Sequence, residues 1–339
     1  MGGGLLMLLS CSEEKKERKI VCWGDSLTAP PLVDKSFKGL LKSMIYGDYS
    51  YPAFLQENLG DDYEIINAGV GGENTLSIMA RQGASPARLN QDIVIYSDKH
   101  QQFDIMIGSS IDMPFVSSWN RKVISLGTQH TWPIERSSMI NPCSIGGKEF
   151  VLRVNHNFWS ENIRNNVSYC EESYYYLDKR FKQLKTDTIR KGTILKTKAM
   201  RELRGAYCSI FFIGQNGGYS STRELIAQLN AMINYSKSKH YIVISHHVPN
   251  QVEKNAKEMC MMEDSLGQEF GPSFINLRRY LVSSGLHDAG LVPTDEDIVA
   301  VKQGKCPPQL LKDGTHFTKD GYKLIAKLVE DKIKMMNNE

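Results

Sequence analysis

The sequence predicts an α/β fold in which a parallel β-sheet carries helices on both faces. Two observations lead to this prediction: short apolar runs typical of buried strands alternate with amphipathic helix patterns, and this alternation occupies both ends of the chain. A third observation defines the domains, because residues 89–204 break the alternation. We therefore expect a sheet domain formed by residues 19–88 and 205–339, interrupted by an insertion at 89–204.

The strands are predicted from apolar runs rich in Val, Ile and aromatic residues. Each run is short enough for a strand and is followed by Gly, Asn, Asp or Ser, which favour turns. Four such runs belong to the sheet domain: residues 19–23, 63–69, 208–214 and 241–247.

The helices are predicted from apolar residues that recur at three- and four-residue spacing. The clearest pattern follows Ser221, which with Glu224 has the spacing of a capping box. Its apolar face consists of Leu225, Ile226, Leu229, Met232 and Ile233. Two further amphipathic segments are residues 51–60 and 320–336.

Residues 89–204 are predicted to form a β-rich insertion domain. They contain short strand-like pieces separated by Gly, Asn, Pro and Ser, and a structureless loop of this length is improbable in a compact domain. The insertion is also rich in aromatic residues, which could stack on sugar rings or form an ordinary small β core. These are Trp119, Trp132, Trp159 and the run Tyr174–Tyr176.

Charge and cysteine content exclude several classes of function. Lys and Arg total 41 against 38 Asp and Glu, and no basic block occurs, so we expect no nucleic-acid partner. None of the seven cysteines forms a CxxC pair, so no zinc or redox motif is expected. Cys22 and Cys208 lie inside apolar strands and are predicted to be buried free thiols, whereas the pairing of the other cysteines stays open.

Residues 1–18 have the pattern of a lipoprotein signal and tether. Five apolar residues, Leu5–Leu9, are too few to span a bilayer, but they precede Ser10 and Cys11 in a sequence that resembles a bacterial lipobox. The acidic residues just after Cys11 resemble the surface-export signals of Bacteroides-type lipoproteins. This resemblance implies a lipid anchor on Cys11 at the periplasmic or outer cell surface. A trimmed start or a disordered tail is the alternative, because the positive residues of a signal are missing.

Residues suited to acyl transfer follow the predicted strands. Ser26 in "GDSLT" follows the first strand, Gly72 in "NAGVGGEN" the second and Asn216 in "GQNGG" the third. Loops at the carboxyl edge of a parallel sheet converge, so a nucleophile and oxyanion donors could meet there. Asp313 and His316 in "DGTH" have the spacing for a carboxylate that orients a general base.

These four motifs together resemble those of the SGNH/GDSL hydrolase superfamily, which includes GDSL-like lipases and acylhydrolases. The resemblance covers residues 19–88 and 205–335. It implies a flavodoxin-like three-layer α/β/α fold and a catalytic triad of Ser26, Asp313 and His316. It also implies an oxyanion hole made by the N–H groups of Ser26 and Gly72 and by the Asn216 amide, with no cofactor.

One position departs from the family pattern. Many members have Gly-x-Asn-Asp in the third motif, whereas this chain has Gly217 after Asn216. The oxyanion donor is kept, so the departure concerns the packing that the missing acid would support. His246 and His247 are rivals for the base, but neither has an acid three residues before it, so a structural or pocket-lining role is favoured. No other ligand cluster has usable spacing, so we expect no metal.

The sequence therefore predicts a serine esterase that acts on a small-molecule or glycan ester, with short acyl groups such as acetyl on carbohydrate as the favoured substrate. Two alternatives remain open. A lipase, thioesterase or acyltransferase would use the same triad. A glycan-binding lipoprotein with a vestigial site would use only the insertion. The oligomeric state is not determined by the sequence.

Overall fold

The computed structural model describes most of the predicted sheet domain and part of the predicted insertion. The described residues are 18–29, 49–89, 92–95, 101–103, 105–106, 142–156, 173–179, 186–250, 252–253 and 255–337. Cys11 and the three tryptophans of the insertion lie outside them. The lipid anchor on Cys11 and the role of these tryptophans, in sugar stacking or in a small β core, therefore stay predictions.

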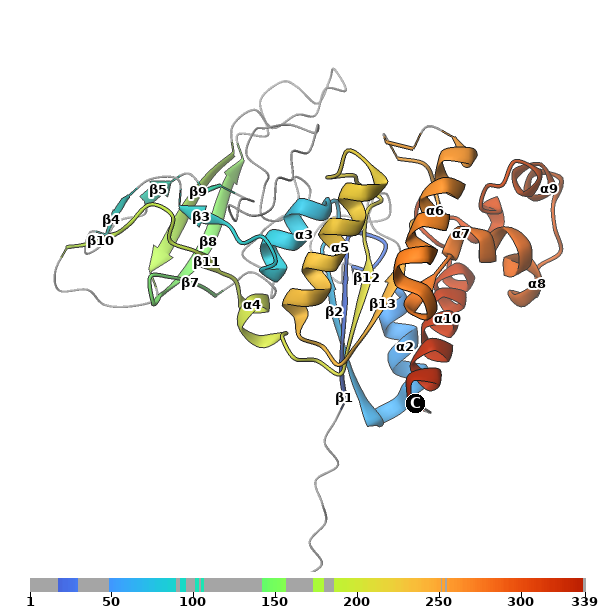
Figure 1. The fold of residues 1–339 in the computed structure, drawn as a ribbon, viewed down its shortest axis with the longest axis horizontal. Helices are drawn as coiled ribbons and strands as arrows, with labels where there is room; N and C mark the ends of the chain where they lie inside the picture. The colour runs from blue at the N-terminus through green and yellow to red at the C-terminus, as the bar shows by residue number, and fades with distance from the viewer. Residues whose placement is uncertain are drawn as a thin grey trace, which may run out of the picture.

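A five-stranded parallel sheet forms the centre of the molecule (Figure 1). The strand order is β14-β13-β12-β1-β2, which is the doubly wound, flavodoxin-like order with the first strand beside the third. The strands are β1 (Arg18–Gly24), β2 (Tyr63–Gly69), β12 (Cys208–Phe212), β13 (His240–Ile244) and β14 (Phe274–Ile275). The predicted α/β class is confirmed. β14 is an addition, because two residues are too short for a strand signal.

Helices cover both faces of this sheet and make it the middle of three layers (Figure 1). One face is covered by α2 (Tyr51–Leu59) and α10 (Lys319–Asn337). The other face is covered by α3 (Thr75–Gln82), α5 (Thr222–Ser236) and α6 (Ala256–Phe270). The predicted helices at 51–60, 221–239 and 320–336 correspond to α2, α5 and α10.

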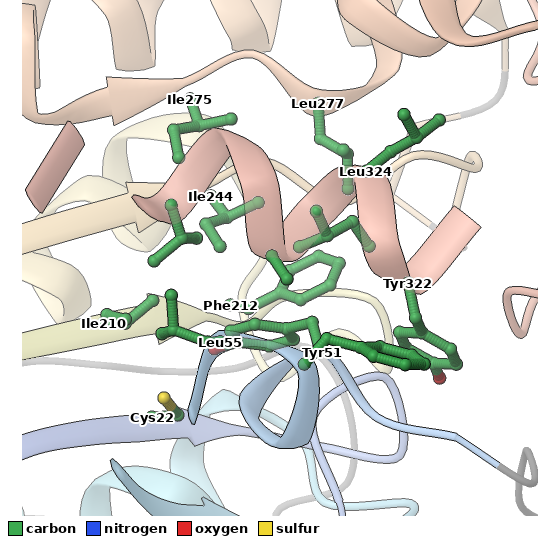
Figure 2. Packing of buried hydrophobic residues seen from close by; sticks show 14 of the residues in the cluster. Cys22, Tyr51, Leu55, Ile210, Phe212, Ile244, Ile275, Leu277, Tyr322 and Leu324 are labelled. Carbon is green, nitrogen blue, oxygen red and sulfur yellow. The ribbon is translucent and has the colours of Figure 1, made fainter. Parts of the chain in front are cut away.

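The alternation of side chains along each strand divides the core into two clusters. In β1, Ile20 and Cys22 point toward α2 and α10, whereas Val21 and Trp23 point toward α3 and α5. Figure 2 shows part of the first cluster, in which the Phe212 ring of β12 lies 6.2 Å from the Tyr51 ring of α2. Both faces of these strands are buried, so they appear in the sequence as continuous apolar runs.

Side-chain caps define where the long helices begin. Ser221 accepts a hydrogen bond from the Glu224 N–H at 3.2 Å and starts α5, as its sequence predicts. The Glu224 carboxylate binds the Ser220 N–H at 2.6 Å rather than closing the capping box on Ser221. Asn255 starts α6 by accepting from the N–H groups of Lys257 and Glu258, each at 3.0 Å.

Short helices and turns connect β14 to α10 (Figure 1). Two 3₁₀ turns, η4 (Gly271–Ser273) and η6 (Pro308–Leu310), flank this region, and η1 (Gly60–Asp62) precedes β2. The helical elements between them are α7 (Leu277–Tyr280), the π-helical turn η5 (Leu281–Gly285), α8 (Leu286–Asp288) and α9 (Asp295–Lys302).

The described part of residues 89–204 consists mainly of antiparallel strands, which lie at one end of the molecule in Figure 1. One sheet has the order β11-β7-β8-β9-β5, and two smaller sheets pair β10 with β4 and β3 with β6. The bounds are β3 (Arg88–Leu89), β4 (Ile93–Ile95), β5 (Gln101–Phe103), β6 (Ile105–Met106), β7 (Cys143–Ile145), β8 (Lys148–His156), β9 (Ser173–Lys179), β10 (Asp187–Ile189) and β11 (Leu195–Lys196). The chain then enters α4 (Lys198–Glu202), whose Ala199 packs in the second core cluster of the parallel sheet.

The prediction that Cys22 and Cys208 are buried free thiols can be compared with the fold. Cys22 and Cys208 are free and buried, as predicted, and burial raises the pKa of Cys22 to about 12. Among the helices that the structure describes, none is long and apolar enough to cross a membrane.

Candidate active site

The pairing register of the central strands brings three sequence motifs to one edge of the sheet. Gly24, the last residue of β1, pairs with Gly69 of β2 on one side and with Phe212 of β12 on the other. The three strands therefore end at the same level. The loops that follow, which carry Ser26, Gly72 and Asn216, leave the sheet side by side.

Ser26 lies in a tight turn that is held by the residue before it. The Asp25 carbonyl accepts hydrogen bonds from the N–H groups of Thr28 and Ala29, at 3.1 and 2.9 Å. One Asp25 carboxylate oxygen, Oδ1, accepts from the Leu27 N–H at 2.9 Å. This turn leaves Ser26 partly exposed while Asp25 and Leu27 are buried.

The loop after β2 packs directly against the serine turn. The Val70 N–H donates to the Gly24 carbonyl at 3.0 Å, and the Asn67 amide donates to the Thr28 carbonyl at 2.7 Å. A Cβ atom at Gly69 would lie 2.3 Å from the Ala29 nitrogen, so only glycine permits this approach. The loop after β2 and the serine turn are therefore in direct backbone contact.

Gly72 is the exposed residue at the tip of the loop after β2, and its φ of 73° lies in the left-handed region that favours glycine. The next residue, Glu73, turns inward and is buried. Its side chain forms an ion pair with Arg81 of α3 at 2.7 Å, with neither side chain exposed. The Arg81 guanidinium lies 5.5 Å from the centre of the Trp23 ring.

Asn216 joins the third loop to the other two through its side chain. The amide nitrogen donates to the Glu73 carbonyl at 3.1 Å and contacts Asp25 Oδ2 at 3.3 Å. The Thr75 N–H donates to the Gly217 carbonyl at 3.1 Å. The side chain of Asn216 therefore contacts the residue before Ser26 and the residue after Gly72, although the three loops follow different strands.

Asp313 and His316 lie in the turn between η6 and α10. The Oδ1 atom of Asp313 accepts from the N–H groups of Thr315 and His316, at 3.1 and 2.7 Å, and closes the turn. The Oδ2 atom lies 2.8 Å from His316 Nδ1. The other ring nitrogen, His316 Nε2, lies 2.9 Å from the Ser26 hydroxyl oxygen.

The hydrogen bonds around Asp313 determine the proton arrangement of this group. Burial alone would raise the pKa of Asp313, but the bonds from the His316 backbone and ring and from the Thr315 N–H outweigh it and hold that pKa below its usual value. The carboxylate is therefore ionised at neutral pH and can only accept. This assigns the proton of neutral His316 to Nδ1 and leaves the Nε2 lone pair facing Ser26.

The histidine turn is anchored by the residue that follows it. Phe317 is fully buried in the first core cluster, and its ring lies 5.4 Å from that of Tyr322 in α10. On the other side, the His247 ring lies 4.2 Å from Phe317. Packing of a large aromatic ring next to His316 limits the positions that the imidazole can take.

His246 and His247, the rivals for the base, are both buried at the end of β13. Burial lowers the pKa of His247 to about 3, so this ring is neutral and serves as packing against Phe317. The ring of His246 is directed to the buried Glu253, with 3.3 Å between Nε2 and Oε2. The contact to Ser26 is made by His316.

Three charged residues of the site were missed at the sequence level. Asp25, Glu73 and Arg81 are each at most 2% exposed. Asp25 contacts the Asn216 amide, and Arg81 forms the ion pair with Glu73. Burial, together with the nearby charge of Glu73, raises the pKa of Asp25 to about 7. The signal available in the sequence was the presence of two acids inside glycine-rich turns, Asp25 beside Gly24 and Glu73 beside Gly72.

No group of three or more His, Cys, Asp and Glu side chains that could hold a metal ion is found in the part of the chain that the structure describes. The contacts at the sheet edge are those of a hydroxyl, an imidazole, a carboxylate and an amide. Chemically, this set can deprotonate a serine and offer hydrogen bonds to a developing negative charge.

Comparisons with known proteins give one structural similarity. No family model and no curated protein matches the sequence. Among solved structures, a carbohydrate acetylesterase family member from Sinorhizobium meliloti is similar, with a TM-score of 0.36 and 12% sequence identity. The superposition covers 95% of this chain and 100% of that chain. At this TM-score, function has to be argued from the geometry of the site.

Proposed function

We propose that this chain is a serine esterase of the SGNH type that works through an acyl-enzyme on Ser26. The observation that carries the proposal is the continuous line of contacts from Asp313 to His316 to Ser26, with distances of 2.8 and 2.9 Å. A nucleophile, a base and a group that orients the base are the three parts of a serine hydrolase. A purely structural cluster would have no need to direct an imidazole lone pair at a partly exposed hydroxyl.

The reaction begins when Ser26 attacks the ester carbonyl. As the bond between Oγ and the carbonyl carbon forms, the hydroxyl proton passes to His316 Nε2, and the Asp313 carboxylate stabilises the imidazolium. The carbonyl oxygen becomes an oxyanion. Its proposed donors are the N–H groups of Ser26 and Gly72 and the Asn216 amide, which keeps its bond to the Glu73 carbonyl and exchanges the longer contact to Asp25 Oδ2 for the oxyanion.

In the following steps, His316 Nε2 gives the proton to the leaving alcohol, and water then hydrolyses the acyl-enzyme. The oxyanion collapses, the bond to the alcohol oxygen breaks, and that oxygen takes the proton from His316 Nε2. Water then enters, gives its proton to Nε2 and attacks the acyl carbon. A second collapse releases the carboxylic acid and returns the proton to Ser26.

We further propose that the substrate is a short acyl ester, such as acetyl, on carbohydrate, and that Cys11 anchors the chain in a bacterial envelope. Support for the first part is the density of tryptophan and tyrosine between residues 89 and 204. Support for the second part is the sequence Leu8-Leu9-Ser10-Cys11.

The test is hydrolysis of p-nitrophenyl esters from acetate to palmitate by the full chain, with Ser26→Ala and His316→Ala beside it. We expect activity that falls with acyl length and that drops at least about 1000-fold in each variant. A fluorophosphonate probe should label wild-type protein at Ser26 and leave Ser26→Ala unlabelled. Equal activity in wild type and Ser26→Ala would refute the proposal.

Substrate class is tested separately with acetylated oligosaccharides and long-chain acyl glycerides. Release of acetate from the oligosaccharides supports the carbohydrate proposal. Preference for the glycerides would overturn it and favour a lipase that uses the same residues.

A further inference from the structure

The loop that carries Asn216 needs an external support. Gly214, Gly217 and Gly218 flank Asn216, and all three have positive φ values. Glycine-rich backbone has many accessible conformations, whereas an oxyanion donor is effective only when its position is set before the reaction. A support must therefore come from outside the loop.

The first contact of such a support is made by Asn250. Its amide nitrogen donates to the Gly214 carbonyl at 2.9 Å, and the same carbonyl accepts from the Gly217 N–H at 3.0 Å. The Asn250 side-chain oxygen accepts from the N–H groups of Val252 and Glu253, at 2.7 and 3.2 Å. Asn250 therefore holds the first turn of the Asn216 loop from the segment after β13.

Behind Asn250 lies a buried group of three polar side chains. The Asn250 amide also donates to the Tyr219 hydroxyl, and that hydroxyl donates to Glu253 Oε1 at 3.1 Å. The second Glu253 oxygen lies 3.3 Å from His246 Nε2. Tyr219 and His246 are 1% exposed and Glu253 is 4% exposed.

The carboxylate of Glu253 sets the direction of these hydrogen bonds. Burial opposes its charge, but the hydrogen bonds and charge interaction with His246 and the hydrogen bond from Tyr219 outweigh burial and keep the pKa of Glu253 below its usual value. An ionised carboxylate only accepts, so the Tyr219 proton must point to it. The Tyr219 oxygen is then free to accept from Asn250, and Asn250 keeps a second N–H for Gly214.

We propose that Tyr219, Asn250, Glu253 and His246 form a positioning network that holds the Asn216 amide in place as an oxyanion donor. The network rests on the proposed esterase function, because it deepens the role of that site. None of its four members contacts Ser26 or the oxyanion directly. They act through the Gly214 carbonyl, and thus through the backbone of the loop. Position 217 is glycine and supplies no carboxylate, and the carboxylate of this network is that of Glu253, 36 positions further along the chain.

The test is a double-mutant cycle between Tyr219→Phe and Asn216→Ala, with hydrolysis of p-nitrophenyl acetate as the assay. Tyr219→Phe keeps the ring in the core and removes only the hydroxyl. We expect it to lower kcat by about 10-fold with little change in KM, since a displaced donor loses part of the roughly 100- to 1000-fold effect of a deleted one. In the Asn216→Ala background, the same substitution should change kcat by less than about 2-fold.

The controls separate positioning from general stability. Tyr280→Phe is the matched control, because it also removes a tyrosine hydroxyl that donates to a carboxylate, in this case Asp288 at 2.8 Å. Tyr280 is not part of the network, so this substitution should leave kcat unchanged. Glu253→Gln offers one acceptor oxygen instead of two and should reproduce the effect of Tyr219→Phe. Thermal melting of every variant ensures that each assay is made on folded protein.

Three outcomes are informative. A loss of kcat that disappears in the Asn216→Ala background supports the network. An equal loss in both backgrounds, or none in either, overturns it while leaving the esterase proposal intact. If wild-type protein neither hydrolyses the ester nor reacts with fluorophosphonate at Ser26, the proposed function fails and the positioning role fails with it.

Discussion

Replacing Asp25 by asparagine removes a buried charge from the site and should make the protein's stability less dependent on pH. The Asp25 side chain is 1% exposed and has two hydrogen-bond contacts, one to the Leu27 N–H at 2.9 Å and one to the Asn216 amide at 3.3 Å. Among the described residues, the groups that shift its pKa include no cation, whereas Glu73 adds a negative charge nearby. Ionisation of Asp25 is therefore unfavourable in the folded state.

The size of the effect follows from the raised pKa. In the folded protein the pKa of Asp25 is about 7, compared with 3.8 for the free side chain. Between these values the folded state holds a proton that the unfolded state has lost, so the stability contributed by Asp25 is full below pH 3.8 and is lost as pH rises through 7. A difference of about three pH units corresponds to about 4 kcal/mol, as an order of magnitude.

The assay is urea unfolding of wild type and Asp25→Asn at intervals from pH 4 to pH 8.5. The free-energy difference between the two proteins should change by up to about 4 kcal/mol in favour of the variant as pH rises. Asparagine has one acceptor oxygen for two donors, so ester hydrolysis should fall in the same variant even where stability rises. A difference that is constant across this pH range would refute the argument, because it would mean that Asp25 does not titrate between the two values.

Two further predictions concern the packing of the loops. Arg81→Met leaves the Glu73 carboxylate buried without its ion-pair partner, and should lower the free energy of unfolding by about 3–5 kcal/mol, with part of the loss recovered in the double variant Arg81→Met/Glu73→Gln. Urea unfolding measures the stability of both variants. A loss below about 1 kcal/mol in Arg81→Met would contradict the importance of the ion pair between Arg81 and Glu73. Gly69→Ala places a Cβ 2.3 Å from the Ala29 nitrogen, so the turn that carries Ser26 has to shift. The substitution should destabilise the fold by about 1–3 kcal/mol or more and slow fluorophosphonate labelling of Ser26. Gly267→Ala, whose nearest neighbour would be 3.6 Å away, is the matched control, and equal melting temperatures for the two alanine variants would contradict the close approach.

The parallel sheet could be predicted from sequence because its strands are buried on both faces. Such strands appear as continuous apolar runs, and the predicted strand at 63–69 agrees with β2 residue for residue. The fifth strand, β14, could not be predicted, because Phe274 and Ile275 alone give no periodic signal. Its identity as a strand depends on pairing with Val243 and Ile244 of β13.

For the site residues, the sequence predicts only which strand each one follows, and not its contacts. Ser26, Gly72 and Asn216 each follow a strand, and the sequence shows that order directly. The buried acids Asp25 and Glu73 were missed, because a charged residue in a turn is normally exposed. Whether such an acid is solvated or buried depends on which loop packs over it, and that is a property of the assembled sheet.

The α/β class, the apolar strands, the Ser221 cap of α5 and the local turn in which Asp313 and His316 lie three residues apart can all be predicted from the sequence alone. These features depend on short-range periodicity and on hydrogen bonds within a few residues. The contact of His316 with Ser26, 290 residues away, and the contact of the Asn216 amide with the Glu73 carbonyl are established by the folded structure and not by local sequence. The reason is that these contacts depend on the strand order and register, which are set by how the two faces of the sheet pack against the helices.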